Sequence, residues 1–223
     1  MTPPKYPEPI VDHTSYLTLT EAIGDLIVDD EIRNKVNPQL SQYQLDSQNG
    51  RTPTINGTPI KTTSPKNTEL SKQTSIVVER FSLFKEGETG AMLKRRILEN
   101  GIDLTGKNAL IEFCAKALVM STTDVVVLFK EARATIEQIE ILLTKKNIRQ
   151  RWASNQPSAT IVTIADDYIS PWEDRTFSVR EMARCQSFDD SFEFLGKRTT
   201  GGLQRRVDNL LQRKNSQSCI HFP

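Results

Sequence analysis

The stretch from Arg175 to Gly196, RTFSVREMARCQSFDDSFEFLG, carries the most specific structural signal in this chain. Ser178 is followed three residues later by Glu181, which is the spacing of a capping box. In this arrangement the serine hydroxyl and the glutamate carboxylate satisfy two backbone N–H groups at a helix start. The spacing therefore predicts a helix that begins at Val179. Its apolar face would carry Val179, Met182, Ala183 and Gln186, and Phe188 would anchor its end in a core.

Two arginines, Arg180 and Arg184, lie four residues apart on another face of the predicted helix. Like charges at this spacing cost a helix roughly 0.2–0.5 kcal/mol, so we expect anionic groups opposite them. The simplest interpretation is an amphipathic helix whose arginines pair with nearby carboxylates such as Glu173 or Asp174.

Polar residues and then aromatic residues follow the predicted helix. The run Asp-Asp-Ser at 189–191 predicts the helix end. The alternation Phe-Glu-Phe at 192–194 predicts a short strand that stops at Gly196.

The literal string R-x-F-S-x-R-E-M-A-R-x-Q-S-F-x-D-x-F-x-F-x-G over 175–196 closely resembles the ninth motif of the 5-cytosine DNA methyltransferases. This motif is long and unusual in composition, so the resemblance is specific. It implies that Arg175, Arg180, Glu181 and Arg184 brace a target-recognition domain against a catalytic half. The motif residues with an expected structural role are Arg175, Ser178, Arg180, Glu181, Arg184, Gln186 and Phe188.

Length and composition set limits on the class of protein. A chain of 223 residues, with 37% hydrophobic and 26% charged residues, can hold one substantial domain or a domain plus an appendage. The net charge of +1 means that any DNA binding must come from local patches. The chain has no signal-peptide or membrane-spanning pattern, which predicts a reducing, cytoplasmic setting without membrane contact. The three cysteines and two histidines make no zinc spacing, so no metal is expected.

A second capping box lies near the start of the chain, at Thr18 and Glu21. It predicts a short amphipathic helix whose apolar face carries Leu19, Ala22, Ile23 and Leu26. A plain core helix explains this pattern by itself. The string LTEAIGDL at 19–26 also resembles the helix that, in these methyltransferases, leads from the last catalytic-domain motif into the target-recognition domain.

The next segments differ sharply in polarity. Residues 37–75 are poor in large apolar side chains and contain two Asn-Gly pairs, which favours a flexible polar loop over a folded hairpin unless the segment docks on something. The resemblance implies a variable loop that lies against DNA here. Residues 76–84 fit either a strand or a helix, and residues 92–100 predict a helix.

Three further helices are predicted between residues 108 and 145, at about 109–120, 123–134 and 136–143, with Ser121 and Thr135 as caps. The direct interpretation is a compact insert that stiffens the recognition domain. A helix-turn-helix that binds DNA is the alternative, but these helices carry more acidic than basic residues.

Basic residues gather after the insert, next to an aromatic residue. Such a cluster suits phosphate contacts, although a solvated helix end is equally common. The string Pro-Ser-Ala-Thr at 157–160 resembles the family's sequence just before the ninth motif, with Thr160-Ile161 as the pair near the extruded nucleotide. The candidate DNA-binding residues are Lys145, Lys146, Arg149, Arg151, Trp152, Thr160 and Thr163.

The chemistry of methyl transfer is absent from the sequence. The resemblance implies a Pro-Cys nucleophile loop, a Glu-Asn-Val segment and a Gly-rich turn that binds S-adenosylmethionine. The cysteines instead follow Phe113, Arg184 and Ser218, and no G-x-G turn occurs. After residue 208 the family would continue with Gly-Asn-Ala-Val-Pro, whereas this tail differs.

These observations predict an α+β fold. It would be a small mixed target-recognition domain with a helical insert and a C-terminal motif helix, and without the doubly wound catalytic sheet. The expected divisions are a lead-in segment with a short helix at 1–35, a polar flexible loop at 36–75, the recognition region at 76–170 with its insert at about 108–145, the ninth-motif helix and strand at 171–208, and a divergent tail at 209–223.

The resemblance implies the C-terminal, DNA-reading part of a 5-cytosine DNA methyltransferase of restriction-modification or phage type. Its expected partners are double-stranded DNA and a separate catalytic N-terminal half. The chain alone would bind no cofactor and be inactive, while the complete enzyme would use S-adenosylmethionine. A stand-alone DNA-binding or regulatory module and a non-functional gene remnant are the alternatives.

Overall fold

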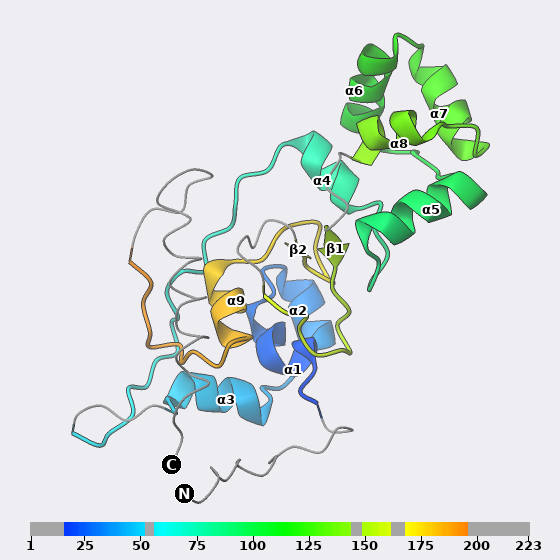
Figure 1. Cartoon of the computed structure of the whole chain (residues 1–223). Helices are drawn as coiled ribbons and strands as arrows, with labels where there is room; N and C mark the ends of the chain where they lie inside the picture. Colours follow the sequence, from blue (N-terminus) through cyan, green and yellow to red (C-terminus); the bar gives the residue numbers. More distant parts are fainter. Residues whose placement is uncertain (1–15, 52–55, 144–148, 162–167, 196–223) are drawn as a thin grey trace, which may run out of the picture.

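Short capped helices make up most of the regular structure in the computed structural model, which describes residues 16–51, 56–143, 149–161 and 168–195. The chain has an α+β fold with two lobes (Figure 1). The helical lobe comprises residues 75–143, and the motif lobe comprises residues 16–51, 56–74, 152–161 and 168–195. The elements are α1 (Leu19–Ile23), the 3-10 helix η1 (Gly24–Leu26), α2 (Asp30–Val36), α3 (Gln42–Asn49), α4 (Ser75–Phe81), α5 (Gly90–Asn100), α6 (Asn108–Leu118), α7 (Thr122–Lys130), α8 (Ile136–Leu143), β1 (Gln150–Arg151), β2 (Tyr168–Ile169) and α9 (Val179–Arg184).

Side-chain caps fix the helix starts, as the sequence predicted. Both predicted capping boxes are present, at Thr18 before α1 and at Ser178 before α9. Ser121 caps α7 by accepting from the backbone N–H of Asp124, and Thr135 accepts from the backbone N–H of Gln138. The three helices predicted between residues 108 and 145 are therefore confirmed, with ends that differ by a few residues.

The prediction of a flexible loop over 36–75 is wrong between residues 42 and 49, which form α3. The Ser41 hydroxyl and the Gln44 side chain make a third capping box. The buried side chain of Gln44 also donates to the backbone oxygen of Thr20 at 3.0 Å. Because polar groups anchor this helix, it leaves no apolar periodicity in the sequence.

The helical lobe is larger than the three-helix insert that the sequence predicted. Helices α4 and α5 share one core with α6, α7 and α8, built around Phe81, Leu93, Ile97 and Phe129. The open choice at residues 76–84 is resolved as a helix, because α4 spans Ser75–Phe81. Two side chains of α4 explain the packing, since Glu79 accepts from the first N–H groups of α6 and Arg80 donates to the last carbonyls of α8. Such distant caps leave no local sequence signal.

A two-stranded parallel sheet joins the lobes, with Gln150 opposite Tyr168 and Arg151 opposite Ile169. The sheet of the described residues contains only these two strands. Residues 192–194, predicted as a strand, belong to none of the described strands, although Glu193 is exposed and Phe194 is buried as the alternation indicated. Among the helices that the structure describes, none is long and apolar enough to cross a membrane.

We expect Gly101→Ala to unfold the helical lobe at lower denaturant concentration than Gly106→Ala. Both glycines have left-handed backbone angles, with φ of 69° and 78°, so alanine costs roughly 1–2 kcal/mol at either position. An added methyl at Gly101 would lie 2.5 Å from the backbone oxygen of Lys130, whereas Gly106 faces open space. The overlap should cost about 1–3 kcal/mol more, measured by urea unfolding. Equal midpoints for the two variants would contradict the packing of α5 against the end of α7.

Candidate functional site

Helix α9 is buried on every face, although half of its six residues are charged. The exposed fractions are 0% for Arg180, 1% for Glu181 and 0% for Arg184. Val179, Met182 and Ala183 are also buried, as the sequence predicted. Burying a charge is costly unless the group is paired and hydrogen-bonded, so the segments around α9 must supply partners. Figure 1 shows α9 in the middle of the motif lobe, beside α1 and α3.

The first buried ion pair joins the start of α9 to the segment that precedes it. Arg175 donates two hydrogen bonds to the Glu181 carboxylate, at 2.9 and 2.8 Å, and contacts Glu173 at 2.6 Å. Glu181 also accepts from the backbone N–H of Ser178, so one carboxylate serves both the cap and the ion pair. Burial alone would lower the pKa of Arg175, but the two carboxylates outweigh this effect and raise it.

The second buried ion pair joins the end of α9 to distant parts of the chain. Arg184 donates to both oxygens of Asp190, at 2.8 and 2.5 Å, and to Asp25 beside α1 at 2.5 Å. Burial would lower the pKa of Arg184, but Asp190 and Asp25 raise it overall. The backbone oxygen of Arg184 also accepts from the Tyr43 hydroxyl of α3. The expectation of an anionic partner is therefore confirmed for Arg184.

Arg180 is held differently, by main-chain carbonyls. Its guanidinium donates to the backbone oxygens of Lys66, Asp189 and Phe192. Burial lowers the pKa of Arg180, with Asp190 acting in the opposite direction. The expected carboxylate partner is therefore wrong for Arg180. The interpretation in which Glu173 and Asp174 pair with the α9 arginines is also wrong, because these carboxylates contact Arg175 and Arg151.

All of these partners belong to the same chain. The resemblance implied that Arg175, Arg180, Glu181 and Arg184 brace this domain against a catalytic half. In the structure the four side chains hold α1, the segment around residue 66 and residues 189–192 together, and their guanidinium and carboxylate groups are buried against those segments. That they also brace the domain against a catalytic half stays a prediction.

The last two motif residues lie beyond the helix end. Phe188 packs with Phe192 and Phe194 in a cluster of three rings, at centroid distances of 5.2 and 5.3 Å, as its anchoring role predicted. Gln186 lies outside α9, which ends at Arg184. The side-chain amide atoms of Gln186 are buried without a hydrogen-bond partner among the described residues.

Trp152 and Arg151 lie in the interior, which does not fit the direct DNA contacts expected of them. Trp152 is 2% exposed and its ring packs at a tilt against Tyr168 and Phe177, at centroid distances of 4.7 and 4.8 Å. Arg151 donates to the backbone oxygens of Phe81 and Ser170 and pairs with Asp174. Arg151 therefore joins the two lobes.

Tyr168 connects this aromatic core to the Thr160 segment. Its hydroxyl donates to the backbone oxygen of Thr160 at 2.9 Å, and Thr160 is exposed. Sequence reasoning missed Tyr168. Its only signal was an aromatic residue that follows the Pro-Ser-Ala-Thr string, which is too weak to indicate a contact with Thr160. Arg149 is half-buried, with its guanidinium 4.9 Å from the centre of the Phe81 ring. Lys145, Lys146 and Thr163 lie outside the described residues, as does the tail at 209–223.

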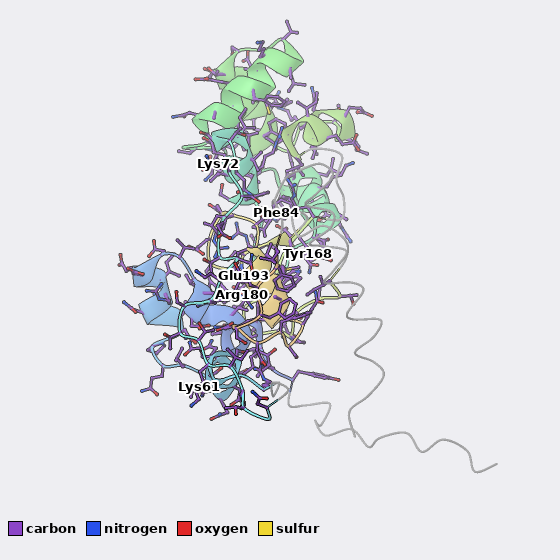
Figure 2. The ribbon with its side chains drawn as sticks, turned by 90° about the vertical axis from the view of Figure 1, so that its left-hand side faces the viewer. Lys61, Lys72, Phe84, Tyr168, Arg180 and Glu193 are labelled. Carbon is purple, nitrogen blue, oxygen red and sulfur yellow. The ribbon has the colours of Figure 1, made fainter. Side chains whose placement is uncertain are left out.

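A basic segment crosses one face of the motif lobe, from residue 56 to residue 74. It is docked on the ninth motif, because Asn67 exchanges hydrogen bonds with Phe194 and its backbone oxygen accepts from the N–H of Arg180. Figure 2 shows this face, with Lys61 and Lys72 along the segment and Arg180 between their labels. Lys61, Lys66 and Lys72 are exposed, and Glu69 is the one acidic residue in the segment.

No group of three or more histidine, cysteine, aspartate or glutamate side chains within the described ranges could hold a metal ion. Cys114 and Cys185 are free thiols, and burial raises the pKa of Cys114 to about 11. Burial also raises the pKa of the Cys185 thiol to about 12, so burial favours the protonated form of both thiols.

Comparison with known protein families gives one match. The model of the C-5 cytosine-specific DNA methylase family matches residues 3–209. No curated protein and no solved structure matches the chain. The matched range contains both predicted capping boxes and every residue of the α9 ion pairs described above.

We expect Glu181→Ala to destabilise the chain far more than Glu21→Ala. Each glutamate completes a capping box, whose loss costs about 0.5–2 kcal/mol. Glu181→Ala also leaves Arg175 buried without its bidentate partner, which raises the total cost to about 3–5 kcal/mol. Urea unfolding of the two variants measures the difference. If both lose the same small free energy of unfolding, Glu181 acts only as a cap.

Proposed function

The chain belongs to the C-5 cytosine-specific DNA methylase family, and on this premise we propose that its residues form the DNA target-recognition part of such an enzyme. They hold duplex DNA at a chosen sequence while a catalytic half, joined or separate, transfers the methyl group to cytosine. The observation that carries this proposal is the combination of the ninth-motif string at 175–196, which departs from the usual Phe-Pro-Asp at 188–190, with the absence of the catalytic motifs from residues 1–223.

Transfer to carbon 5 needs a cysteine thiolate that adds to carbon 6 of a flipped cytosine. None of the three cysteines follows a proline, and the two in the described ranges pack in or against hydrophobic cores. Cys114 lies in the core of the helical lobe, and Cys185 packs beside the core that contains Trp152. The nucleophile must therefore be a residue other than Cys114 and Cys185.

S-adenosylmethionine is the methyl donor that the complete enzyme would use. A donor site in this family needs a Gly-rich turn after a strand of a doubly wound sheet. The described sheet has two strands, and no G-x-G turn occurs in the sequence. The residues present do not fit the donor, so we assign no step of the transfer to them.

We place the DNA along the basic segment 56–74 and the exposed Thr160. The resemblance implies that a variable loop in this part of the chain lies against DNA. Lys61, Lys66 and Lys72 supply exposed positive charge, which supports this assignment because phosphate neutralisation dominates DNA affinity. Arg151 and Trp152 serve this surface indirectly, by fixing the core that holds Thr160. Arg149, Lys145, Lys146 and Thr163 remain candidates for phosphate contacts.

We expect the double variant Lys61→Ala/Lys72→Ala to bind duplex DNA more weakly than the wild-type chain. If each lysine neutralises one phosphate, the slope of log K against log salt should fall by about 0.9 per lysine. The control, Lys116→Ala/Lys130→Ala, removes the same charge from exposed positions on the helical lobe. It should leave the DNA affinity and the salt slope unchanged. Fluorescence anisotropy over a range of salt concentrations measures them.

Two results would contradict the proposal. A larger effect of the Lys116/Lys130 variant would favour a DNA-binding module built on the helical lobe. Methyl transfer from S-adenosylmethionine by residues 1–223 alone would show that the catalytic site is present after all. Methylation only after addition of a catalytic half from this family would support the proposal.

A further inference from the structure

The segment 156–161 lies over the core of the motif lobe and exposes the side chain of Thr160. Ala159 and Ile161 are partly buried and pack against the core that contains Trp152, whereas Thr160 between them is exposed. Threonine is β-branched and has few rotamers, so the position of its hydroxyl follows the position of its backbone. The contacts that hold this backbone therefore decide where the Thr160 hydroxyl lies.

Hydrogen bonds hold the backbone of this segment at two places. At its start, the backbone oxygen of Gln156 accepts from the N–H of Leu19 at 2.9 Å, which ties the segment to α1. At Thr160 itself, the backbone oxygen accepts from the Tyr168 hydroxyl at 2.9 Å. The bond from Tyr168 is therefore the one that acts directly on the exposed residue.

Tyr168 is itself fixed by the interior of the protein. It lies in β2, where the two lobes meet, and is 6% exposed (Figure 2). Its ring packs against the ring of Trp152, and the N–H of Trp152 donates to the backbone oxygen of Ile169, the residue after Tyr168, at 3.1 Å. A phenylalanine ring would make the same packing contact. The hydroxyl is therefore the group that links the aromatic core to Thr160.

We propose that Tyr168 is a positioning residue for DNA binding, because its hydroxyl sets the place from which Thr160 contacts a phosphate. This inference rests on the proposed function, which lays duplex DNA against Thr160. A hydrogen bond from a hydroxyl to a phosphate depends on distance and direction, and it neutralises no charge. Loss of the Tyr168 hydroxyl should therefore weaken DNA binding without changing its dependence on salt.

Tyr43 offers a matched control for Tyr168. Its hydroxyl also donates to a main-chain carbonyl of the motif lobe, that of Arg184. Tyr43→Phe and Tyr168→Phe each remove a hydrogen bond from a tyrosine to a carbonyl and keep the ring, but only Tyr168→Phe acts on Thr160. If both hydroxyls were merely structural, the two variants would have similar effects on DNA binding.

The first experiment measures the affinity of the full chain for duplex DNA by fluorescence anisotropy over a range of salt concentrations. We expect Tyr168→Phe to raise the dissociation constant roughly two- to tenfold, the range that corresponds to one hydrogen bond. The slope of log K against log salt should stay unchanged, because no charge is removed. Tyr43→Phe should bind DNA as the wild-type chain does.

A double-mutant cycle shows whether Tyr168 acts through Thr160. In a Thr160→Val background the hydroxyl that contacts the phosphate is gone, so Tyr168→Phe should weaken DNA binding no further. An equal loss of affinity from Tyr168→Phe with and without Thr160→Val would overturn the proposal. Equal losses in Tyr168→Phe and Tyr43→Phe would also overturn it.

The second experiment tests the positioning without DNA. NMR relaxation of isotope-labelled threonine methyl groups gives an order parameter for the Thr160 side chain. This order parameter should fall in Tyr168→Phe and stay at the wild-type value in Tyr43→Phe. An unchanged order parameter in Tyr168→Phe would contradict the positioning role.

The two experiments separate this inference from the proposed function. A fall in the Thr160 order parameter together with wild-type DNA binding by Thr160→Val would overturn the role of Tyr168 in DNA binding and the placement of DNA at Thr160. Weaker binding by Lys61→Ala/Lys72→Ala in the same assay would still support a DNA-binding function. Loss of affinity in both Thr160→Val and Tyr168→Phe, without additivity, would support the inference.

Discussion

The charges buried around α9 are the constraint on which the motif lobe depends. Three guanidinium groups and one carboxylate enter a water-poor interior within a few residues of one another, which is unfavourable unless each finds partners. Some partners are local, such as Glu173 and residues 189–192, and others, at residues 25 and 66, are more than 100 positions away. The motif therefore ties these segments into one packed lobe, in which each of its buried charges has partners.

This constraint explains how a polar segment can be held in place on the motif lobe. Residues 56–74 bury little apolar surface, yet Asn67 attaches them to Arg180 and Phe194. The lysines on that segment stay exposed while its backbone is held in place. The helical lobe is attached through Arg151, which donates to a carbonyl from each lobe. Under the proposed function, interior contacts would thus set the positions of the residues that read DNA.

Local signals in the sequence predicted most helices and the interior of the motif. Capping boxes at Thr18 and Ser178 and the periodicity of the insert each depend on residues a few positions apart. Helix α3 was missed because its buried side chains, Gln44 and Ser47, are polar. The extent of the helical lobe was missed because Glu79 and Arg80 cap helices far along the chain.

The site residues also include some that local sequence predicted and some whose surroundings only the three-dimensional structure shows. Trp152 and Arg151 have the composition of a DNA-contacting cluster, and only three-dimensional packing shows that they are interior. The partner of Arg184 in Asp25, 159 positions away, could not be inferred from spacing. The ninth motif was identified by its literal string, whereas the way it is enclosed depends on contacts that no short window of sequence contains.

Amide hydrogen exchange of the isolated 223-residue chain tests most directly whether these residues enclose α9 by themselves. The account predicts that the amides of α9 exchange among the slowest in the chain, because they open only when the motif lobe unfolds. Helix α2, which buries none of its residues, is the internal reference for fast exchange. Exchange of α9 as fast as that of α2 would contradict the account, because the buried charges would then need another polypeptide to complete their surroundings.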